Sequence, residues 1–253
     1  MPIIAMANQK GGSGKTTAAM VIAGEMIAVG GRVAFIEGDP NRHLARWANA
    51  RGNPVIDAQV SKVQSHVAAL DLIREKAGDS KVIVITTDND DREIFEWLEA
   101  AAEWAHFVIV DPEGSPNQWM ATAMSQADLV LIPFTPAAMD ANQVGMTVRH
   151  LRSIEKIARK KIPFRVLLTR SNPVPTKDER ELKRRMAEAQ LPMLETFLQD
   201  RPAFRALFMR ASLLNELDPE EVNGLPKARI NAVSLLREIA AVLDAEEKKE
   251  DAA

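Results

Sequence analysis

The sequence predicts an α/β fold in which helices flank a doubly wound, mostly parallel sheet. Strand-like and helix-like segments alternate along the 253-residue chain, as they do where helices connect parallel strands. No glycine/serine linker, repeat or low-complexity stretch interrupts this alternation before the charged tail. We therefore expect one domain over residues 1–245 and a frayed helical tail over residues 246–253.

The first strand and the first helix are predicted by a change of hydrophobic period. An apolar run at residues 2–7 predicts a strand. Residues 16–29 predict a helix, because apolar side chains recur on one face before Gly30 and Gly31 end it. The residues on that face are Ala19, Ile22, Met26 and Val29.

The loop "NQKGGSGKTT", residues 8–17, joins this strand to this helix. The phosphate-loop pattern G-x-x-x-x-G-K-[ST] requires glycine where the chain has Gln9, and a second lysine follows at Lys10. Glycines let backbone N–H groups converge on an anion, and the helix N-terminus adds partial positive charge. In such a loop Lys15 reaches the β- and γ-phosphates of a triphosphate, and Thr16 coordinates Mg²⁺. The alternative is a glycine-rich turn with a stray lysine, which the flanking strand and helix disfavour.

Two acids follow the next predicted strand, residues 32–36. Glu37 and Asp39 stand at its carboxyl end, where open α/β sheets bind their ligands. Carboxylates there could hold Mg²⁺ through water or orient an attacking water. The alternative is an acidic turn in which Pro40 ends the strand.

A third acid, Asp111, ends the apolar strand predicted at residues 107–110. This is the Walker B arrangement, in which the acid supports the Mg²⁺ shell. An apolar run before an aspartate is a weak signal alone and a strong one in a chain with a phosphate loop.

The remaining segments complete the sheet. Further strands are predicted at residues 81–88, 127–136 and 164–173, and helices at residues 92–104 and 142–159. Residues 55–78 predict a strand and then a helix, whereas residues 214–229 are ambiguous.

The composition limits the classes of function. With 46% hydrophobic and 26% charged residues, the chain is typical of soluble proteins, and we expect it in the cytoplasm because no membrane span or signal peptide is evident. It contains no cysteine, which excludes disulfides, thiolate metal sites and cysteine nucleophiles. A net charge of −3 gives no general attraction to nucleic acid, so DNA binding would need a local basic patch.

Four segments together resemble the deviant Walker A ATPases of the ParA/MinD group. These segments, "KGGSGKTT", "EGDPN", "FVIVDPEG" and "LVLIPFTP", match in order and spacing, and the resemblance covers nearly the whole chain. It implies ATP and Mg²⁺ as cofactors. It also implies a nucleotide-sandwich homodimer in which Lys10 acts in trans on the partner's phosphates, much as an arginine finger does.

The resemblance also assigns roles to individual residues. Catalytic roles fall to Lys10, Lys15 and Asp39, of which Asp39 positions the attacking water. Nucleotide contacts fall to Gly11, Gly12, Ser13, Gly14, Lys15, Thr16 and Thr17, with Asn172 at the purine-reading position. Metal binding falls to Thr16, Glu37, Asp39 and Asp111. The chain departs from the family pattern at Glu37 and Asn41, which replace Asp and Gln, and in the displaced proline of "DPEGSP".

The implied function is DNA partition. Short ParA proteins bind double-stranded DNA without sequence preference, and the matching segment here places Arg201, Arg205 and Arg210 as DNA-contacting candidates. For each arginine, a solvated helix face is the alternative. The resemblance implies an ATPase that positions plasmids or chromosomes at the nucleoid, with a partner protein that stimulates hydrolysis. The acidic C-terminus disfavours membrane binding.

Other functions within reach of the same motifs stay open. The segments "DPNRHLARW" and "QDRPAFRALFMRASLLNEL" are similar to the ParA-like protein of the virulence C operon, which promotes T-DNA processing and conjugative transfer. An ATP-gated adaptor that positions a protein assembly or acts at a membrane surface is a further alternative. A nitrogenase iron-protein relative is disfavoured by the lack of cysteine, and no substrate pocket specifies a small-molecule ligase.

Overall fold

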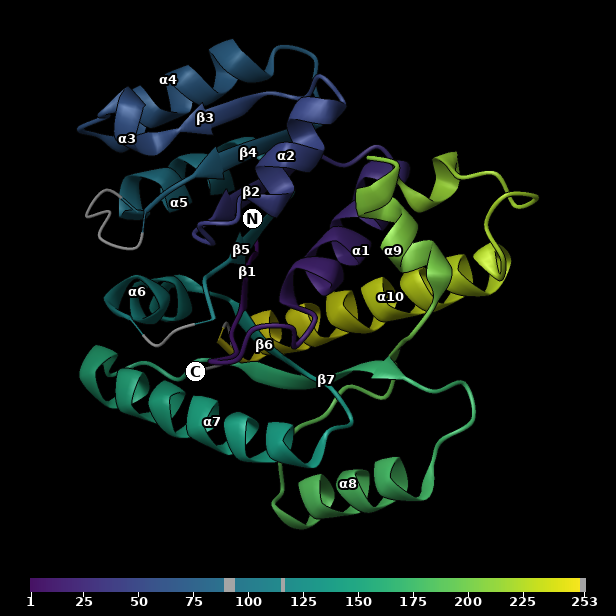
Figure 1. The fold of residues 1–253 in the computed structure, drawn as a ribbon. Coiled ribbons are helices and arrows are strands. Elements are labelled where there is room, and N and C mark those ends of the chain that lie inside the picture. The colour runs from purple at the N-terminus through teal and green to yellow at the C-terminus, as the bar shows by residue number, and fades with distance from the viewer. Residues whose placement is uncertain (89–93, 115–116, 251–253) are drawn as a thin grey trace.

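A single eight-stranded sheet forms the centre of the molecule (Figure 1). The computed structural model describes residues 1–88, 94–114 and 117–250. The strands are β1 (Ile3–Met6), β2 (Val33–Glu37), β3 (Val55–Asp57), β4 (Val82–Thr86), β5 (Phe107–Asp111), β6 (Leu129–Phe134), β7 (Phe164–Ser171) and β8 (Leu198–Gln199). Their order is β3-β4-β2-β5-β1-β6-β7-β8, and each of these pairings is parallel. This confirms the predicted α/β class.

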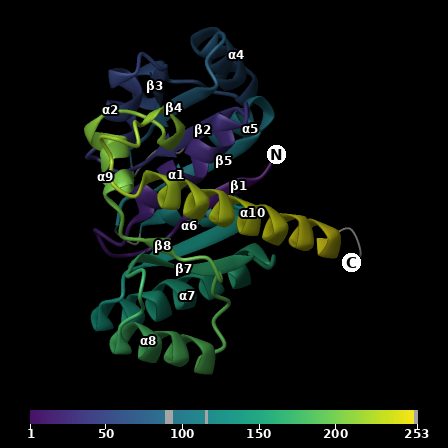
Figure 2. The same ribbon diagram turned by 90° about the vertical axis from the view of Figure 1, so that its right-hand side faces the viewer.

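Helices cover both faces of the sheet (Figures 1 and 2). One face is covered by α1 (Lys15–Ala28), α2 (His43–Ala50), α9 (Pro202–Met209), the 3₁₀ helix η1 (Leu214–Glu216) and α10 (Leu225–Glu250). The other is covered by α3 (Ala58–Ser61), α4 (His66–Ala77), α5 (Ile94–Trp104), α6 (Gln118–Gln126), α7 (Ala138–Ala158) and α8 (Lys177–Glu188). Parallel strands have to be buried on both faces, which explains their continuous apolar runs.

Alternation along the strands divides the core into two layers. In β1, Ile4 and Met6 face the layer beneath α1 and α10, whereas Ala5 faces the layer beneath α5 to α7. This is the two-residue period of a strand. Because α10 packs on α1 from outside, α1 is buried over most of its surface. Of the residues on the predicted apolar face of α1, Ala19 and Ile22 are buried. Val29 is not, because it is 78% exposed at the end of the helix.

The carboxyl ends of the central strands meet at one edge of the sheet. The register pairs Glu37 of β2 with Asp111 of β5, and β1 lies between β5 and β6. The chain passes from β1 to β2 on one side and reaches β6 and β7 on the other, so the strand order reverses here. Open sheets form their ligand crevice at such a point.

Most predicted elements are present, with shifted ends. The ambiguous region contains η1 and the start of α10, and β8 is a two-residue strand that no pattern in the sequence predicts. The predicted helix start at residues 92 and 93 lies outside the described residues, and α7 begins four residues before the predicted position.

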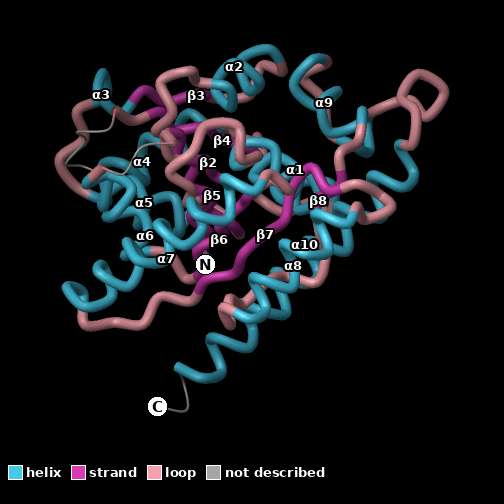
Figure 3. Tube along the Cα trace, turned by 60° about the horizontal axis from the view of Figure 1, so that its bottom comes forward, coloured by secondary structure: helices cyan, strands magenta, loops and turns pink. Residues whose placement is uncertain are grey.

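The expected tail does not begin as a separate segment. Helix α10 continues through Glu250, and its last turns project beyond the sheet (Figures 2 and 3). An ion pair of 3.1 Å between Arg165 and Glu246 ties this part of the helix to β7. Among the described residues, no helix is both long and apolar enough to cross a membrane.

Candidate nucleotide-binding site

The loop between β1 and α1 has the backbone shape of a phosphate-binding loop. Gly12 and Gly14 have φ angles of 77° and 92°, in the left-handed region where glycine carries no steric penalty. Gly14 is also close-packed, since a Cβ atom there would lie 3.0 Å from the hydroxyl oxygen of Thr169. The outer side of the loop is open, because a Cβ atom at Gly11 or Gly12 would meet nothing within 4 Å.

Neighbouring strands hold this loop in place. The Asn8 amide donates to the carbonyl oxygen of Pro133 at 2.6 Å, and its side-chain oxygen accepts from the Lys10 backbone N–H at 3.0 Å. The Thr169 hydroxyl lies 2.8 Å from the Ser13 carbonyl oxygen and 3.0 Å from that of Phe134. The loop therefore depends on contacts from β6 and β7.

Lys15 begins α1 and lies across the loop. Its side chain is buried, and its ammonium group donates to the carbonyl oxygens of Asn8 and Lys10, each at 3.4 Å. Burial lowers the pKa of the Lys15 ammonium, an effect opposed mainly by the charge of Asp111. The lysine thus has the position that the loop pattern predicts for binding phosphate oxygens.

Thr16 and Asp111 meet directly behind the loop. The Thr16 hydroxyl donates to Oδ2 of Asp111 at 2.7 Å. Asp111 is fully buried, and burial raises the pKa of its carboxyl to about 6. Its second oxygen, Oδ1, is buried without a hydrogen-bond partner in the described part of the chain. A hydroxyl and an orphaned carboxylate oxygen beside a phosphate loop fit the donor set of Mg²⁺, which prefers oxygen ligands and retains several waters.

Protein groups alone do not complete a metal cage here. In the described ranges, no group of three or more His, Cys, Asp or Glu side chains is arranged to hold a metal ion. Mg²⁺ at such a site takes its remaining ligands from phosphate oxygens and water. The metal and the nucleotide would therefore bind together.

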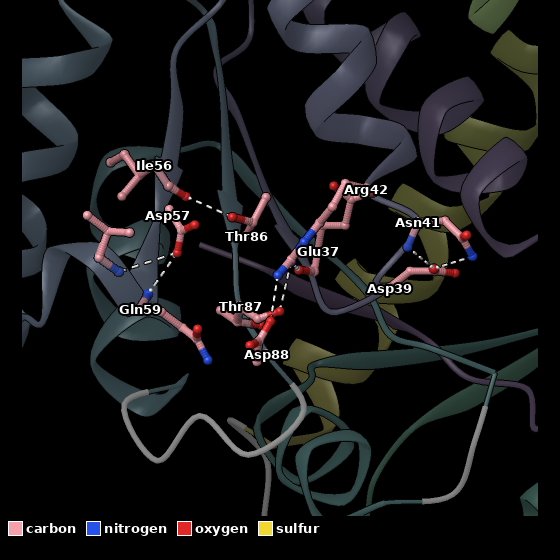
Figure 4. A network of polar contacts seen from close by, with 11 residues as sticks. Glu37, Asp39, Asn41, Arg42, Ile56, Asp57, Gln59, Thr86, Thr87 and Asp88 are labelled. Atoms are coloured by element: carbon pink, nitrogen blue, oxygen red, sulfur yellow. Dashed lines mark hydrogen bonds and ion pairs between the residues drawn. The ribbon is translucent and has the colours of Figure 1, made fainter.

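Asp39 lies in the loop after β2, on the same edge of the sheet. Its Oδ1 accepts hydrogen bonds from the backbone N–H and the side-chain amide of Asn41, at 2.8 and 2.9 Å (Figure 4). The second oxygen, Oδ2, makes neither of these bonds. Asn41, which departs from the family pattern, thus orients the carboxylate of Asp39.

Arg42 attaches this loop to the neighbouring strand β4. Its Nη1 donates to the carbonyl oxygens of Glu37 and Thr87, at 2.9 and 2.8 Å, and its Nη2 pairs with Asp88 at 2.7 Å (Figure 4). The residue has a φ of 51°, a left-handed conformation that costs a non-glycine residue about 1–2 kcal/mol. The hydrogen bonds offset this strain and fix the path of the chain on both sides of Asp39.

Two adjoining cavities lie at this edge of the sheet. The larger, about 410 Å³, is lined by residues 11, 12 and 14–17 of the loop, by Asp39, Asn41 and His43, and by Gly114, Arg170 and Phe208. The smaller, about 250 Å³, is lined by Gly14, Thr17, Thr169, Arg170, Leu198, Gln199, Asp200, Arg201, Phe204 and Arg205. A cavity of about 510 Å³ lies elsewhere, between the end of α10 and the start of β1, and includes none of the predicted site residues. We assign the site to the two adjoining cavities because the phosphate loop and Asp39 line the larger of them.

Comparison with known proteins gives the family. The model of the ATPase family MipZ matches residues 2–149, a span that includes the loop, Asp39 and Asp111. The chain belongs to the MipZ family of ATPases. This membership confirms the expected enzyme class, and the matches below confirm the resemblance to ParA-type proteins.

The relatives of this MipZ-family chain include proteins that match most of its length. Protein ParA of Rhizobium radiobacter is 29% identical over 247 residues, which cover 96% of this chain and all of the relative. Protein virC1 of Rhizobium rhizogenes is 26% identical over 220 residues, covering 84% of this chain and 83% of the relative. Among solved structures, an McdA–ATP complex from Cyanothece has a TM-score of 0.68 at 19% identity, covering 95% of this chain and 96% of that one. The structural likeness supports the shared fold.

One predicted metal ligand of this MipZ-family ATPase has a different role. Glu37 is fully buried, and its two carboxylate oxygens accept the backbone N–H groups of Leu44 and Ala45, at 2.7 and 3.0 Å. These N–H groups lie in the first turn of α2, where an acidic side chain satisfies unpaired donors. Burial raises the pKa of the Glu37 carboxyl to about 7. The prediction of Glu37 as a Mg²⁺ ligand is therefore not supported, because both oxygens bind the helix.

The predicted purine-reading residue also lies apart from the site. Asn172 is exposed and lines neither cavity. Its backbone N–H and side-chain amide donate to Glu179 Oε1, at 2.8 and 3.2 Å, at the start of α8. The residues of β7 that line the cavities are Thr169 and Arg170.

The three predicted DNA-contacting arginines are each paired within the chain. Arg201 contacts the Gln199 side-chain oxygen, Arg205 pairs with Asp200, and Arg210 pairs with Glu221. Arg201 and Arg205 line the smaller cavity, whereas Arg210 lines neither. Their role in DNA binding stays a prediction, as does the action of Lys10 in trans.

Two close contacts at this site have no clear sequence signal. A Cβ atom on Gly38 would lie 2.9 Å from the Trp119 ring, so this indole packs directly under the loop that carries Asp39. A Cβ atom on Gly114 would lie 3.1 Å from the Gly11 backbone nitrogen, so the chain after Asp111 lies against the phosphate loop. Glycine at both positions permits an approach that other residues would obstruct.

Proposed function

We propose that this chain is a Mg²⁺-dependent ATPase that dimerises around ATP, binds DNA without sequence preference and positions DNA cargo such as a plasmid or chromosome. The observation that carries the nucleotide part is the hydrogen bond between Thr16 and Asp111, directly behind Lys15 and the phosphate loop. The partition part is supported by the match with Protein ParA along 96% of the chain.

The site residues divide the work between binding and hydrolysis. The loop N–H groups and Lys15 bind the β- and γ-phosphates, and Thr16 and Asp111 would hold Mg²⁺. When bound, Mg²⁺ neutralises negative charge on the phosphate oxygens. Asp39, oriented by Asn41, aligns the attacking water and accepts its hydrogen bond. The family relationship to ATPases agrees with this assignment.

Dimerisation would complete the site. The outer surface of the loop at Gly11 and Gly12 is open, which leaves room for a lysine from a second copy to approach the phosphates. In this proposal Lys10 of each copy approaches the phosphates bound by the other copy, so hydrolysis depends on the dimer. A stimulating partner protein would then control when the dimer separates.

The proposed DNA binding follows from the number of basic contacts that a dimer can make. A dimer doubles the number of basic contacts to DNA phosphates, and each contact increases the salt dependence of binding. Since ATP favours the dimer, it would also favour the DNA-bound state. Arg201, Arg205 and Arg210 remain the proposed contacts, and they would exchange their intramolecular partners for phosphates. We therefore expect the protein to be cytoplasmic and associated with the nucleoid.

An electrophoretic shift on random-sequence duplex DNA tests the proposal. The purified protein is compared with ATP, with ADP and without nucleotide, at two salt concentrations. We expect a shift with ATP alone that weakens at higher salt. A protein that binds and hydrolyses ATP but shifts DNA in none of these conditions would contradict the DNA-positioning part.

A second candidate function is the promotion of conjugative or T-DNA transfer. The similarity to virC1 over 220 residues favours it. Both functions use the same ATP-dependent DNA binding, so the shift assay does not separate them. Plasmid loss and transfer frequency, measured in a strain that lacks the gene, do.

A further inference from the structure

We infer that Arg170 is a nucleotide-binding residue of this site and contacts the α-phosphate, where the phosphate chain joins the nucleoside. The inference rests on the proposal that the two adjoining cavities hold ATP. The larger cavity is lined by the phosphate loop, and the smaller adjoins it at the start of α1. A nucleotide with its phosphates on the loop would place its nucleoside in the smaller cavity.

Arg170 lies at the junction of the two cavities. The residues that line both are Gly14, Thr17 and Arg170, and Arg170 supplies the charge among these three. The apolar side chains Leu198 and Phe204 and the polar side chain of Gln199 line the smaller cavity. Such a mixture suits a base and a ribose, whereas the glycine loop suits phosphates.

A β-bulge directs Arg170 toward this junction. Strand β7 pairs Thr169 with Leu198 and Ser171 with Gln199, so β7 advances two residues while β8 advances one. The extra residue is Arg170, and its φ of 50° is left-handed. Bulges near active sites redirect a side chain, and strained backbone is retained where function requires it. Thr169 and Ser171 on either side are buried, whereas Arg170 is exposed.

The Arg170 guanidinium also lacks a partner within the described residues. The structure gives this side chain neither a hydrogen bond nor an ion pair in the ranges it describes, although it is fully charged at neutral pH. The other two arginines of the smaller cavity are engaged, Arg201 with Gln199 and Arg205 with Asp200. Arg170 is therefore available to an anion, and its planar donor group matches the oxygens of a phosphate.

The test is Arg170→Gly, because glycine adopts the same backbone angle without strain. The matched control is Arg159→Gly, since Arg159 is also an exposed arginine with a left-handed φ of 54° and lines neither cavity. Dissociation constants for ATP, ADP and inorganic triphosphate are measured by calorimetric titration. A charged hydrogen bond contributes about 1.5–3 kcal/mol, so we expect Arg170→Gly to weaken ATP and ADP binding roughly 10- to 150-fold.

Further measurements separate binding from structure. We expect Arg170→Lys to recover part of the affinity that Arg170→Gly loses, and Arg159→Gly to bind as the wild type. Equal affinities of Arg170→Gly and wild type would overturn the inference while leaving the proposed function intact. Weakened nucleotide binding with unchanged inorganic triphosphate binding would also overturn it, because the arginine would then contact the nucleoside. A wild-type protein that fails to bind ATP would overturn the proposed function itself.

Discussion

The Thr16 hydroxyl and the Asp111 carboxylate are joined by a hydrogen bond of 2.7 Å across 95 residues of sequence. This bond fixes the start of α1 against the end of β5. The phosphate loop and the Walker B acid are therefore held in a fixed position relative to each other. It leaves Asp111 Oδ1 without a hydrogen-bond partner inside the described chain. The pair is thus arranged to receive a cation that binds together with the nucleotide.

Lys15→Gln should abolish measurable ATP binding. The substitution removes the buried ammonium that lies across the loop and with it the charge that faces the β- and γ-phosphates. Titration with a fluorescent ATP analogue measures the effect. Lys10→Ala is the paired variant, because it should keep wild-type affinity and lose dimerisation or turnover. Retained binding by Lys15→Gln would show that the loop assignment is wrong.

Asp39→Ala should bind ATP and hydrolyse it at least about 100-fold more slowly, the usual scale for loss of a group that accepts a proton or orients water. The ATP-bound dimer should accumulate as a result. Phosphate release measures the rate, and size-exclusion chromatography with ATP measures the dimer. Asn41→Ala should have a smaller effect in the same direction, because it only releases the carboxylate from its two hydrogen bonds. Normal turnover by Asp39→Ala would exclude its catalytic role.

Arg42→Ala should lower the free energy of unfolding by about 2 kcal/mol, the scale for losing charged hydrogen bonds. Arg42→Gly removes the same bonds but relieves about 1–2 kcal/mol of left-handed strain, against about 0.5–1 kcal/mol of extra chain entropy. It should therefore be roughly 0.5–1 kcal/mol more stable than Arg42→Ala. Urea unfolding measures both values. Both variants should also hydrolyse ATP more slowly, because the path of the chain around Asp39 is released. An Arg42→Gly variant less stable than Arg42→Ala would contradict the assigned strain.

Glu37 should make the protein less stable as the pH rises. Its pKa is raised from 4.5 to about 7 in the folded protein, so between these values the folded state binds more protons than the unfolded state. Stability therefore falls with increasing pH in this window, by about 3 kcal/mol at most for a shift of this size. Asp111 contributes in the same direction below about pH 6.

Chemical unfolding at several pH values between 4 and 8 measures this dependence. Glu37→Gln removes the titrating group, so its stability should change less across the window than that of the wild type. The comparison concerns the slope, because glutamine also disturbs the two backbone hydrogen bonds and changes the baseline. Equal slopes would show that the folded pKa of Glu37 is close to its ordinary value.

The sequence predicts those parts of the site that follow from the hydrophobic period and from the order of strands, loops and helices along the chain. A strand, a glycine loop and a helix place Lys15 and Thr16, and the rule that parallel strands present their carboxyl ends at one edge places Asp39 and Asp111 beside them. The family pattern reinforces these positions. The placement of these four residues could therefore be predicted without coordinates.

The residues that were missed or misassigned depend on backbone conformation and on hydrogen-bond partners. Arginine gives no sign that position 42 or 170 is left-handed, since glycine or asparagine usually marks such positions. An acid after a strand does not reveal that both oxygens of Glu37 are taken up by α2. The two-residue strand β8 is too short to show a period, so the bulge opposite it could not be expected either.

The contact between Gly38 and Trp119 makes the intrinsic fluorescence of this tryptophan a probe of the Asp39 loop. Trp119 is 2% exposed, and its indole ring lies at contact distance under the loop that carries Asp39. Its emission wavelength depends on the polarity around the ring, so a displacement of that loop during the ATP cycle would shift its fluorescence. With Trp47, Trp97 and Trp104 replaced by phenylalanine, the remaining signal would follow loop movement in real time without an added dye.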